Sequence, residues 1–326
     1  MAGLSTTLPN PPPTTPPVLG CDVGKDSITI FDTASAMYRT VPNTPKDIKA
    51  FVKKQGRGVL LICEATGGHE TALLQAASAA GLQAVRADPG KASAYVRSFR
   101  SHGKTDRIDA RALARYGEER GHFLPCWQPP SEAQQALAKL VRFRADLVSD
   151  RADHIRRLKA PGDGPDKRHI EATIEALSQR IALVEADIEH YRHQDRHLEQ
   201  VTAIIEAIPG CGAKTAIVLA ALMPELGQLN RSQAAALAGL APHPKQSGRS
   251  DHYRRIKGGR REIRTAMFMA ALAASRYNPI LKAHYQQLIG RGKKPIVALT
   301  AVARKLITII NARIRDAIFP QHEQLC

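Results

Sequence analysis

The first 125 residues alternate between short apolar runs and amphipathic stretches. Two apolar runs, 18–23 and 27–33, flank Gly24-Lys25-Asp26, and this arrangement predicts a β-hairpin. Further strands are predicted over 36–42, 59–63 and 82–87, and helices over 45–55, 65–80 and 105–119. A strand meander followed by strands that alternate with helices predicts an α/β sheet covered by helices.

A heptad pattern marks the middle of the chain. Seven apolar residues from Ile170 to Tyr191 follow one another at alternating spacings of four and three residues. A weaker seam lies in a predicted helix over 131–159, and the Pro/Gly-rich segment 161–165 separates the two. The pattern predicts a long antiparallel helical hairpin or coiled coil over residues 131–200. Such a seam either packs within one chain or forms a dimerisation arm, and the pattern does not distinguish the two.

Residues 201–326 are predicted to be mainly helical, which makes the fold class α/β plus α. The segment 208–216 resembles the turn of a helix-hairpin-helix. There, Gly210 and Gly212 would let backbone amides approach a phosphate beside Lys214. At the other end of the chain, residues 1–17 contain six prolines and are predicted to form a disordered tail outside any core.

The charge of the chain narrows the class of partner. Lys and Arg number 47 against 30 Asp and Glu, a net charge of +17, which favours a polyanion such as nucleic acid. The aromatic content of 5% argues against base stacking as the main binding mode. Five cysteines without a CxxC pair indicate a reducing cytoplasm and no zinc site. We expect neither a membrane span nor a secretion signal.

Four acidic residues are the candidate catalytic and metal-ligating groups. Asp22 and Glu64 each end an apolar strand, where a carboxylate is costly unless it is paired or binds a cation. Asp106 and Asp109 lie three apart and would share one face of a helix. Strand Asp, strand Glu and helical DxxD suit a two-metal phosphoryl-transfer centre with Mg²⁺ as the cofactor. For the helical pair alone, a capping role, with Asp106 as the cap, is the favoured alternative.

A basic segment lies in the last third of the chain. Residues 245–264 carry eight Lys or Arg against two acids, with Gly258-Gly259 inside. This composition favours a flexible loop that contacts phosphate over the solvated face of a helix. Ser247 and Ser250 lie in Gln246-Ser247-Gly248-Arg249-Ser250, and a serine near glycine and arginine is a candidate nucleophile, because arginines stabilise both an incoming phosphate and a developing oxyanion. Taken alone, an ordinary loop serine remains the more common interpretation.

Several sequence blocks share the order and spacing of one known family. They are Gly20-Cys21-Asp22-Val23-Gly24-Lys25, Cys63-Glu64-Ala65-Thr66-Gly67, Lys104-Thr105-Asp106-Arg107-Ile108-Asp109-Ala110, Ile208-Pro209-Gly210-Cys211-Gly212 and Ala238-Gly239-Leu240-Ala241-Pro242, continuing through Ser247-Gly248 to Lys257-Gly258-Gly259 and Arg264. Over residues 18–310 the chain thereby resembles the bacterial insertion-sequence transposases of the "one-ten" group. That group includes Piv-type DNA invertases and bridge-RNA-guided recombinases.

The resemblance implies a RuvC-like (RNase H fold) catalytic domain over 18–130, a coiled coil over 131–200 and a C-terminal transposase domain over 201–326. It implies that Asp22, Glu64, Asp106 and Asp109 are DEDD ligands for Mg²⁺. The family's catalytic serine falls on Ser247, which would form a covalent phosphoserine link to DNA, acting with the acids across subunits. A shifted alignment would move that role to Ser250.

The resemblance also implies the partners. They are donor and target DNA and a structured bridge RNA that chooses both sites by base pairing, with the protein as a homodimer or tetramer in the bacterial cytoplasm, at the nucleoid. The basic and glycine residues of the matched blocks are the candidate nucleic-acid contacts. They are Lys104, Gly210, Gly212, Lys214, Lys245, Arg249, Arg254, Arg255, Lys257, Arg260, Arg261 and Arg264.

Two other classes of function compete with a recombinase. A Holliday-junction-resolvase-like endonuclease would use the same acids to activate water, with no covalent link, but it has no need of the basic segment with its serine. A non-catalytic nucleic-acid scaffold built on the coiled coil would leave the strand-terminal Asp22 and Glu64 unexplained.

Overall fold

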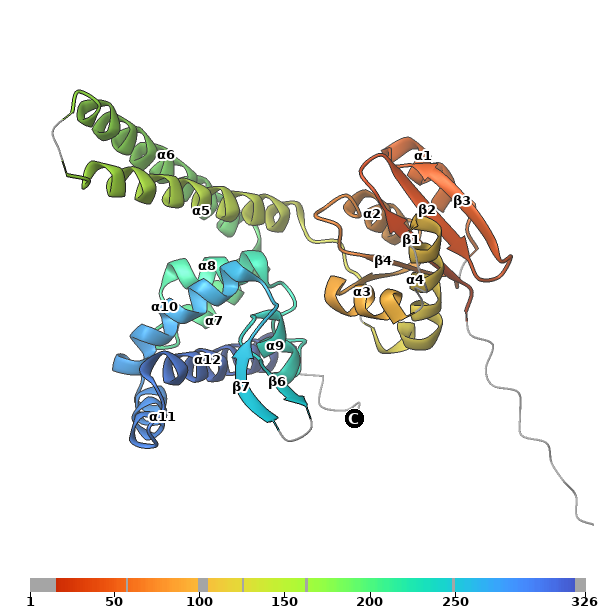
Figure 1. Ribbon diagram of the computed structural model, residues 1–326. Helices are drawn as coiled ribbons and strands as arrows, with labels where there is room; N and C mark the ends of the chain where they lie inside the picture. Colours follow the sequence, from red (N-terminus) through yellow and green to blue (C-terminus); the bar gives the residue numbers. More distant parts are fainter. Residues whose placement is uncertain are drawn as a thin grey trace, which may run out of the picture. The chain divides into compact units, whose positions relative to one another are not determined.

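The computed structural model describes residues 16–56, 58–98, 105–124, 126–161, 164–247 and 250–319, and for 96, 122, 243–247 and 250–255 the backbone alone. The chain divides into two compact units, the first ending at Pro129 and the second beginning at Pro130 (Figure 1). The expected tail lies almost wholly outside the described residues.

A five-stranded mixed sheet forms the centre of the first unit. Its strands are β1 (Val18–Val23), β2 (Ser27–Asp32), β3 (Met37–Pro42), β4 (Leu60–Glu64) and β5 (Gln83–Ala87). Their order is β3-β2-β1-β4-β5. The pairs β3–β2 and β2–β1 are antiparallel, whereas β1–β4 and β4–β5 are parallel. The predicted α/β sheet is confirmed.

Helices cover both faces of this sheet, and each strand therefore alternates between two cores. On one face, Leu19 and Cys21 of β1 pack with residues of α1 (Pro45–Val52) and α2 (Thr71–Ala79). On the other, Val18 of β1 and Ile62 of β4 pack with α3 (Pro89–Ser98) and α4 (Asp106–Arg120). Since side chains along a strand alternate in direction, the even-numbered residues of β1 and β4 face α4.

Two helices of this unit differ from the sequence prediction. The helix predicted over 65–80 begins only at Thr71, because Gly67 and Gly68 have positive φ angles of 73° and 109° that a helix does not allow. Helix α3 was not predicted, since its Pro-Gly start and its few apolar residues give no clear helical period.

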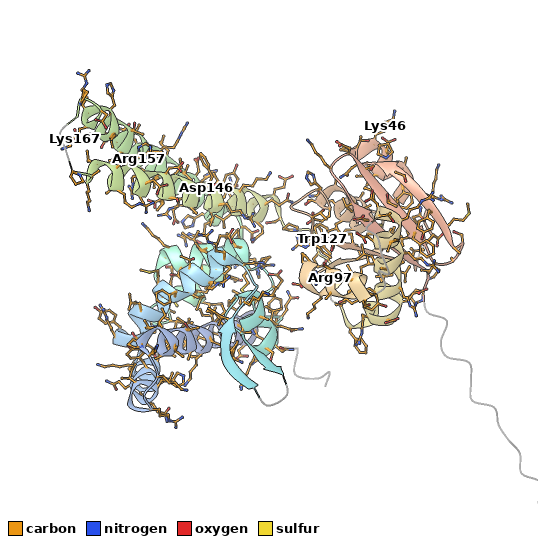
Figure 2. All side chains as sticks on the ribbon, in the orientation of Figure 1. Lys46, Arg97, Trp127, Asp146, Arg157 and Lys167 are labelled. Carbon is orange, nitrogen blue, oxygen red and sulfur yellow. The ribbon has the colours of Figure 1, made fainter. Side chains whose placement is uncertain are left out.

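The second unit begins with a helical hairpin of α5 (Glu132–Leu158) and α6 (Lys167–Gln194). Arg144 pairs with Glu185 at 2.6 Å, and Arg151 donates to Ser178 at 3.3 Å, which fixes an antiparallel register. Figure 2 shows side chains projecting along its length, with Lys167 at the end where α6 begins. The helical hairpin is thus observed, whereas supercoiling of the pair stays a prediction.

Helices make up most of the rest of this unit. They are α7 (Arg196–Glu206), α8 (Ala213–Leu222), α9 (Arg231–Leu237), α10 (Arg261–Tyr277), α11 (Pro279–Gly290) and α12 (Pro295–Ile318). Although α12 is long and apolar enough to cross a membrane, buried residues such as Val302, Leu306 and Ile310 belong to the core of this unit. A core helix explains its composition.

The basic segment is not the loop that its composition predicts. Its backbone forms an antiparallel pair, β6 (Pro242–Ser247) and β7 (Ser250–Ile256), with Ser247 opposite Ser250. Backbone pairing satisfies polar groups that a loop would expose to water, and this gain is invisible in a count of charges.

Candidate metal and DNA-cleavage site

Asp22 and Glu64 lie side by side at the carboxyl ends of two parallel strands. Cys21 of β1 is the register partner of Cys63 of β4, and each acid follows its cysteine by one residue. Both carboxylates are half-buried, and both occupy even-numbered positions that face α4. The two acids therefore share one edge and one face of the sheet, as the strand-end pattern predicts.

Helix α4 approaches β1 closely because residue 20 is a glycine. A Cβ atom placed on Gly20 would lie 2.2 Å from the carbonyl oxygen of Ala110 and 2.3 Å from the nitrogen of Ala114. Both are backbone atoms of α4, so no side-chain rotation relieves the overlap. Gly20 thus determines how near the helix, with its acids, comes to Asp22.

We expect Gly20→Ala to push α4 away from β1 and to destabilise the first unit. The expected loss in the free energy of unfolding is about 3 kcal/mol, since overpacking against backbone cannot be relieved locally. Urea unfolding of the variant measures this loss. Gly56→Ala, at a position with open space around its Cβ, is the matched control and should leave the unfolding midpoint nearly unchanged. Equal stabilities of the two variants would contradict the close approach.

Two further glycines show that α4 runs antiparallel to β1 and β4. A Cβ on Gly117 would meet Val18 at 2.6 Å and Ile62 at 3.0 Å, and one on Gly121 would meet Leu60 at 2.4 Å. The C-terminal end of α4 therefore lies over the N-terminal ends of β1 and β4.

The same geometry brings the first turn of α4 to the level of Asp22. Along the helix axis, the distance from the middle of the Ala110–Ala114 contact back to the middle of the Asp106–Asp109 pair is about 7 Å, at ~1.5 Å per residue. Along β1, the distance from Gly20 to Asp22 is also about 7 Å, at ~3.3 Å per residue. Asp106 and Asp109 are consequently expected at about the level of Asp22 along the strand direction.

The capping alternative with Asp106 as the cap is wrong. The cap of α4 is Thr105, whose hydroxyl accepts a hydrogen bond from the Ile108 amide at 3.3 Å. Asp106 is the first residue of the helix. Asp109 lies on the buried side of the helix and is only 9% exposed. Capping therefore does not account for the burial of Asp109.

Two arginines of the same helix stack on aromatic rings of the sheet. The Arg107 guanidinium lies 5.2 Å from the ring centroid of Tyr38, and that of Arg111 lies 5.7 Å from the ring of Phe31. Phe31 and Tyr38 are register partners on β2 and β3. These cation–π contacts fix the rotation of α4, and the sequence analysis did not identify them.

Sequence reasoning also missed two residues that hold the loops behind the acids. The Asn43 side-chain amide donates to the carbonyl oxygens of Gly24, at 2.8 Å, and His69, at 3.3 Å. These two carbonyls belong to the loops that follow Asp22 and Glu64. Glu70, which is 2% exposed, accepts hydrogen bonds from the second of these loops. An expected run of α-helix concealed this loop in the sequence.

The carboxylates fit a divalent cation by chemical type, because hard oxygen donors suit Mg²⁺. Across the described ranges of the chain, no three His, Cys, Asp or Glu side chains are gathered closely enough to hold a metal ion as they stand. Burial raises the pKa of both the Cys21 and the Cys63 thiol, and both thiols pack in the core on the α1–α2 face of the sheet, away from the face that the acids share.

The second unit contains the glycine-rich turn between α7 and α8. Gly210 has a φ of 102°, and a Cβ there would lie 2.5 Å from the Cα of Ala274. Gly212 is the N-cap of α8, and a Cβ there would meet nothing within 4 Å. Lys214 in the first turn is 78% exposed, although its ammonium lies 3.5 Å from Glu185. The turn thus has the open helix start that a phosphate contact requires.

The candidate cations near α10 divide into two groups. Arg260 donates to both carboxylate oxygens of Glu225, at 2.6 and 2.8 Å, and to the Leu222 carbonyl at 2.7 Å. Arg264 donates to the Gly258 carbonyl at 3.0 Å. Lys257 and Arg261 are exposed. The structure therefore gives Arg260 and Arg264 partners inside the protein and leaves Lys257 and Arg261 facing solvent.

Several candidate residues lie outside what the structure describes. Lys104 and Arg249 fall outside the described residues. For four others only the backbone is described, on β6 and β7. They are Lys245, Ser247, Arg254 and Arg255.

Comparisons with known proteins match most of the chain. A family described as "Transposase" (DEDD_Tnp_IS110) matches residues 19–161, and one described as "Transposase IS116/IS110/IS902 family" matches residues 202–286. The pilin gene-inverting protein of Moraxella lacunata is 31% identical over 268 residues, which cover 78% of this chain and 80% of that protein. The chain belongs to the IS110 family of transposases.

Other matches cover less of this transposase. The 43.6 kDa protein of insertion element IS110 from Streptomyces coelicolor is 30% identical over 205 residues, 57% of this chain and 48% of that one. A solved structure titled "T. thermophilus RuvC in complex with Holliday junction substrate" covers 34% of this chain and 99% of its own, at 16% identity and a TM-score of 0.28. As a member of the family, this transposase is an enzyme that acts on DNA by phosphoryl transfer.

Proposed function

We propose that this IS110-family transposase cuts and rejoins donor and target DNA at a divalent metal site held by Asp22, Glu64, Asp106 and Asp109. The observation that carries this proposal is the close packing of α4 against Gly20 of β1, two residues before Asp22, on the face of the sheet that Asp22 and Glu64 share. The acids would hold Mg²⁺ on the scissile phosphate, where the ion supplies charge stabilisation for the transferring phosphoryl group.

In this proposal, Ser247 is the nucleophile of the reaction. Its Oγ loses its proton and forms a bond to the scissile phosphorus while a P–O bond of the DNA backbone breaks, and the leaving oxygen gains one proton, so that protons balance. Attack of a DNA hydroxyl on the phosphoserine then reverses the step and frees the serine. Water in place of serine, as in a resolvase-like endonuclease, would cut DNA without storing the bond energy needed for rejoining.

Phosphate contacts would come from the exposed basic groups of the second unit. Lys257, Arg261 and Lys214 are exposed, and Gly212 leaves the start of α8 open. Lys104, Lys245, Arg249, Arg254 and Arg255 extend the same proposal. Arg260, paired with Glu225, would instead support the local structure of the segment. Such contacts fix the position of the DNA without reading its sequence.

Sequence choice would then lie in an element-encoded bridge RNA. The net charge of +17 suits two polyanionic partners. The protein would hold the RNA by backbone and shape, and would act in the cytoplasm, at the nucleoid, as a dimer or tetramer.

A recombination assay with purified protein and plasmids carrying donor and target sites tests the proposed function. We expect joined product only when both Mg²⁺ and element-derived RNA are present, with loss of product in EDTA and recovery on adding Mg²⁺. Recombination that persists in EDTA would contradict the metal role. Recombination by wild-type protein without any element-derived RNA would contradict the guide role and leave the metal role standing.

A further inference from the structure

A buried carboxylate lies just behind Glu64. Glu70, 2% exposed, accepts hydrogen bonds through one oxygen from the amides of Thr66, at 3.1 Å, and Gly68, at 2.9 Å. The same oxygen accepts from the Thr66 hydroxyl at 3.3 Å. All three donors belong to the loop that leaves Glu64. Burying a carboxylate is costly, and these charge-assisted hydrogen bonds offset the cost.

The other oxygen of Glu70 faces the neighbouring strand. It lies 3.8 Å from the Arg86 guanidinium, and Arg86 of β5 is the register partner of Cys63. Cys63 directly precedes Glu64. The carboxylate of Glu70 therefore connects the loop after Glu64 to the residue of β5 that pairs with Cys63, one position before Glu64.

Two glycines lie in the middle of this loop. Gly67 and Gly68 have positive φ angles, and a Cβ on either would meet nothing within 4 Å. Glycines with open space around them restrict the backbone only weakly. The far end of the loop is held by Asn43, which donates to the His69 carbonyl. Glu70 thus holds the loop from Thr66 onward, two residues after Glu64.

We propose that Glu70 is a positioning residue that holds Glu64 at the metal-binding edge. This inference rests on the proposed role of Glu64 as a metal ligand. Glu70 acts through the Thr66 and Gly68 amides and does not itself face the cation. Without its charge, the loop samples other conformations, and the Glu64 carboxylate meets the ion in a smaller fraction of molecules. Groups that orient metal ligands in this way contribute about 10- to 100-fold in metal affinity.

The test is direct binding of Mn²⁺ to the full-length protein, followed by electron paramagnetic resonance, together with the Mg²⁺ dependence of DNA cleavage. Glu70→Gln keeps the shape of the side chain and removes its charge. We expect its dissociation constant for Mn²⁺ to rise about tenfold. The half-saturating Mg²⁺ concentration should rise in parallel, whereas the cleavage rate at saturating Mg²⁺ stays near that of wild type. Glu171→Gln, which removes an exposed carboxylate of α6, is the control and should change neither value.

A folded Glu70→Gln protein with wild-type Mn²⁺ affinity would overturn the inference. So would a reduced maximal rate with unchanged metal dependence. If Glu70→Gln does not fold, Thr66→Val removes the hydroxyl donor alone. It should weaken Mn²⁺ binding about threefold, in line with the loss of one hydrogen bond, and no change would overturn the inference. Asp22→Asn in the same titration separates the two proposals, because unchanged Mn²⁺ binding there would contradict the metal site itself.

Discussion

Asp22→Asn is expected to abolish DNA cleavage and recombination while the first unit stays folded. The change keeps the size of the side chain and removes its negative charge at the edge shared with Glu64 and the first turn of α4. Losing one ligand of a phosphoryl-transfer centre costs several kcal/mol of transition-state stabilisation, on the order of a thousandfold in rate. Single-turnover cleavage of a labelled donor DNA measures the effect.

A matched variant on the same strand pair separates chemistry from stability. Asp26→Asn changes an exposed acid in the turn after β1 and should cleave at the wild-type rate. Circular dichroism should show equal folding of both variants. Cleavage by Asp22→Asn within about tenfold of wild type, a difference of only ~1.4 kcal/mol, would mean that Asp22 is not a ligand of the reacting centre.

Ser247→Ala is expected to eliminate the covalent protein–DNA intermediate and all joined product. Removing a covalent nucleophile lowers the rate by a factor on the order of 10⁴ or more. Trapping on a nicked or suicide DNA substrate, followed by denaturing electrophoresis, should show a shifted protein band for wild type and none for the variant.

Ser250→Ala is the control for this assignment, because Ser250 is the register partner of Ser247 across the β6–β7 pair. It should still form the adduct. An adduct formed by Ser247→Ala and lost in Ser250→Ala would move the nucleophile by three residues. DNA cut by wild type without any adduct would instead support the resolvase-like use of water.

The strand-terminal acids were accessible from sequence because they depend on local pattern. An apolar run of five or six residues ending in a carboxylate predicts a strand end, and parallel strands bring such ends together. The position of α4 along the sheet could not be predicted from the sequence. It depends on Gly20 meeting Ala110 and Ala114, a contact between residues about 90 positions apart that leaves no periodic signal.

Other differences have equally physical causes. The residues from Thr71 onward are rich in alanine and leucine, and this composition led to a helix being predicted from residue 65. The glycine loop that Glu70 organises was therefore not predicted. Arg260 was expected to contact nucleic acid from its charge alone, but Glu225, 35 residues earlier, pairs with it. Charge counts cannot distinguish a cation paired inside the protein from one facing solvent, because pairing is decided by tertiary packing.

Backbone cleavage by iron tests the metal site most directly. Fe²⁺ bound in place of Mg²⁺, with ascorbate and peroxide, generates radicals that cut the polypeptide next to the ion, and mass spectrometry locates the cuts. We predict cuts in three segments, around Asp22, around Glu64 and around Asp106–Asp109, all suppressed by excess Mg²⁺ and by Asp22→Asn. Cuts confined to other segments, or cuts unchanged in Asp22→Asn, would contradict a metal ion held jointly by these four acids.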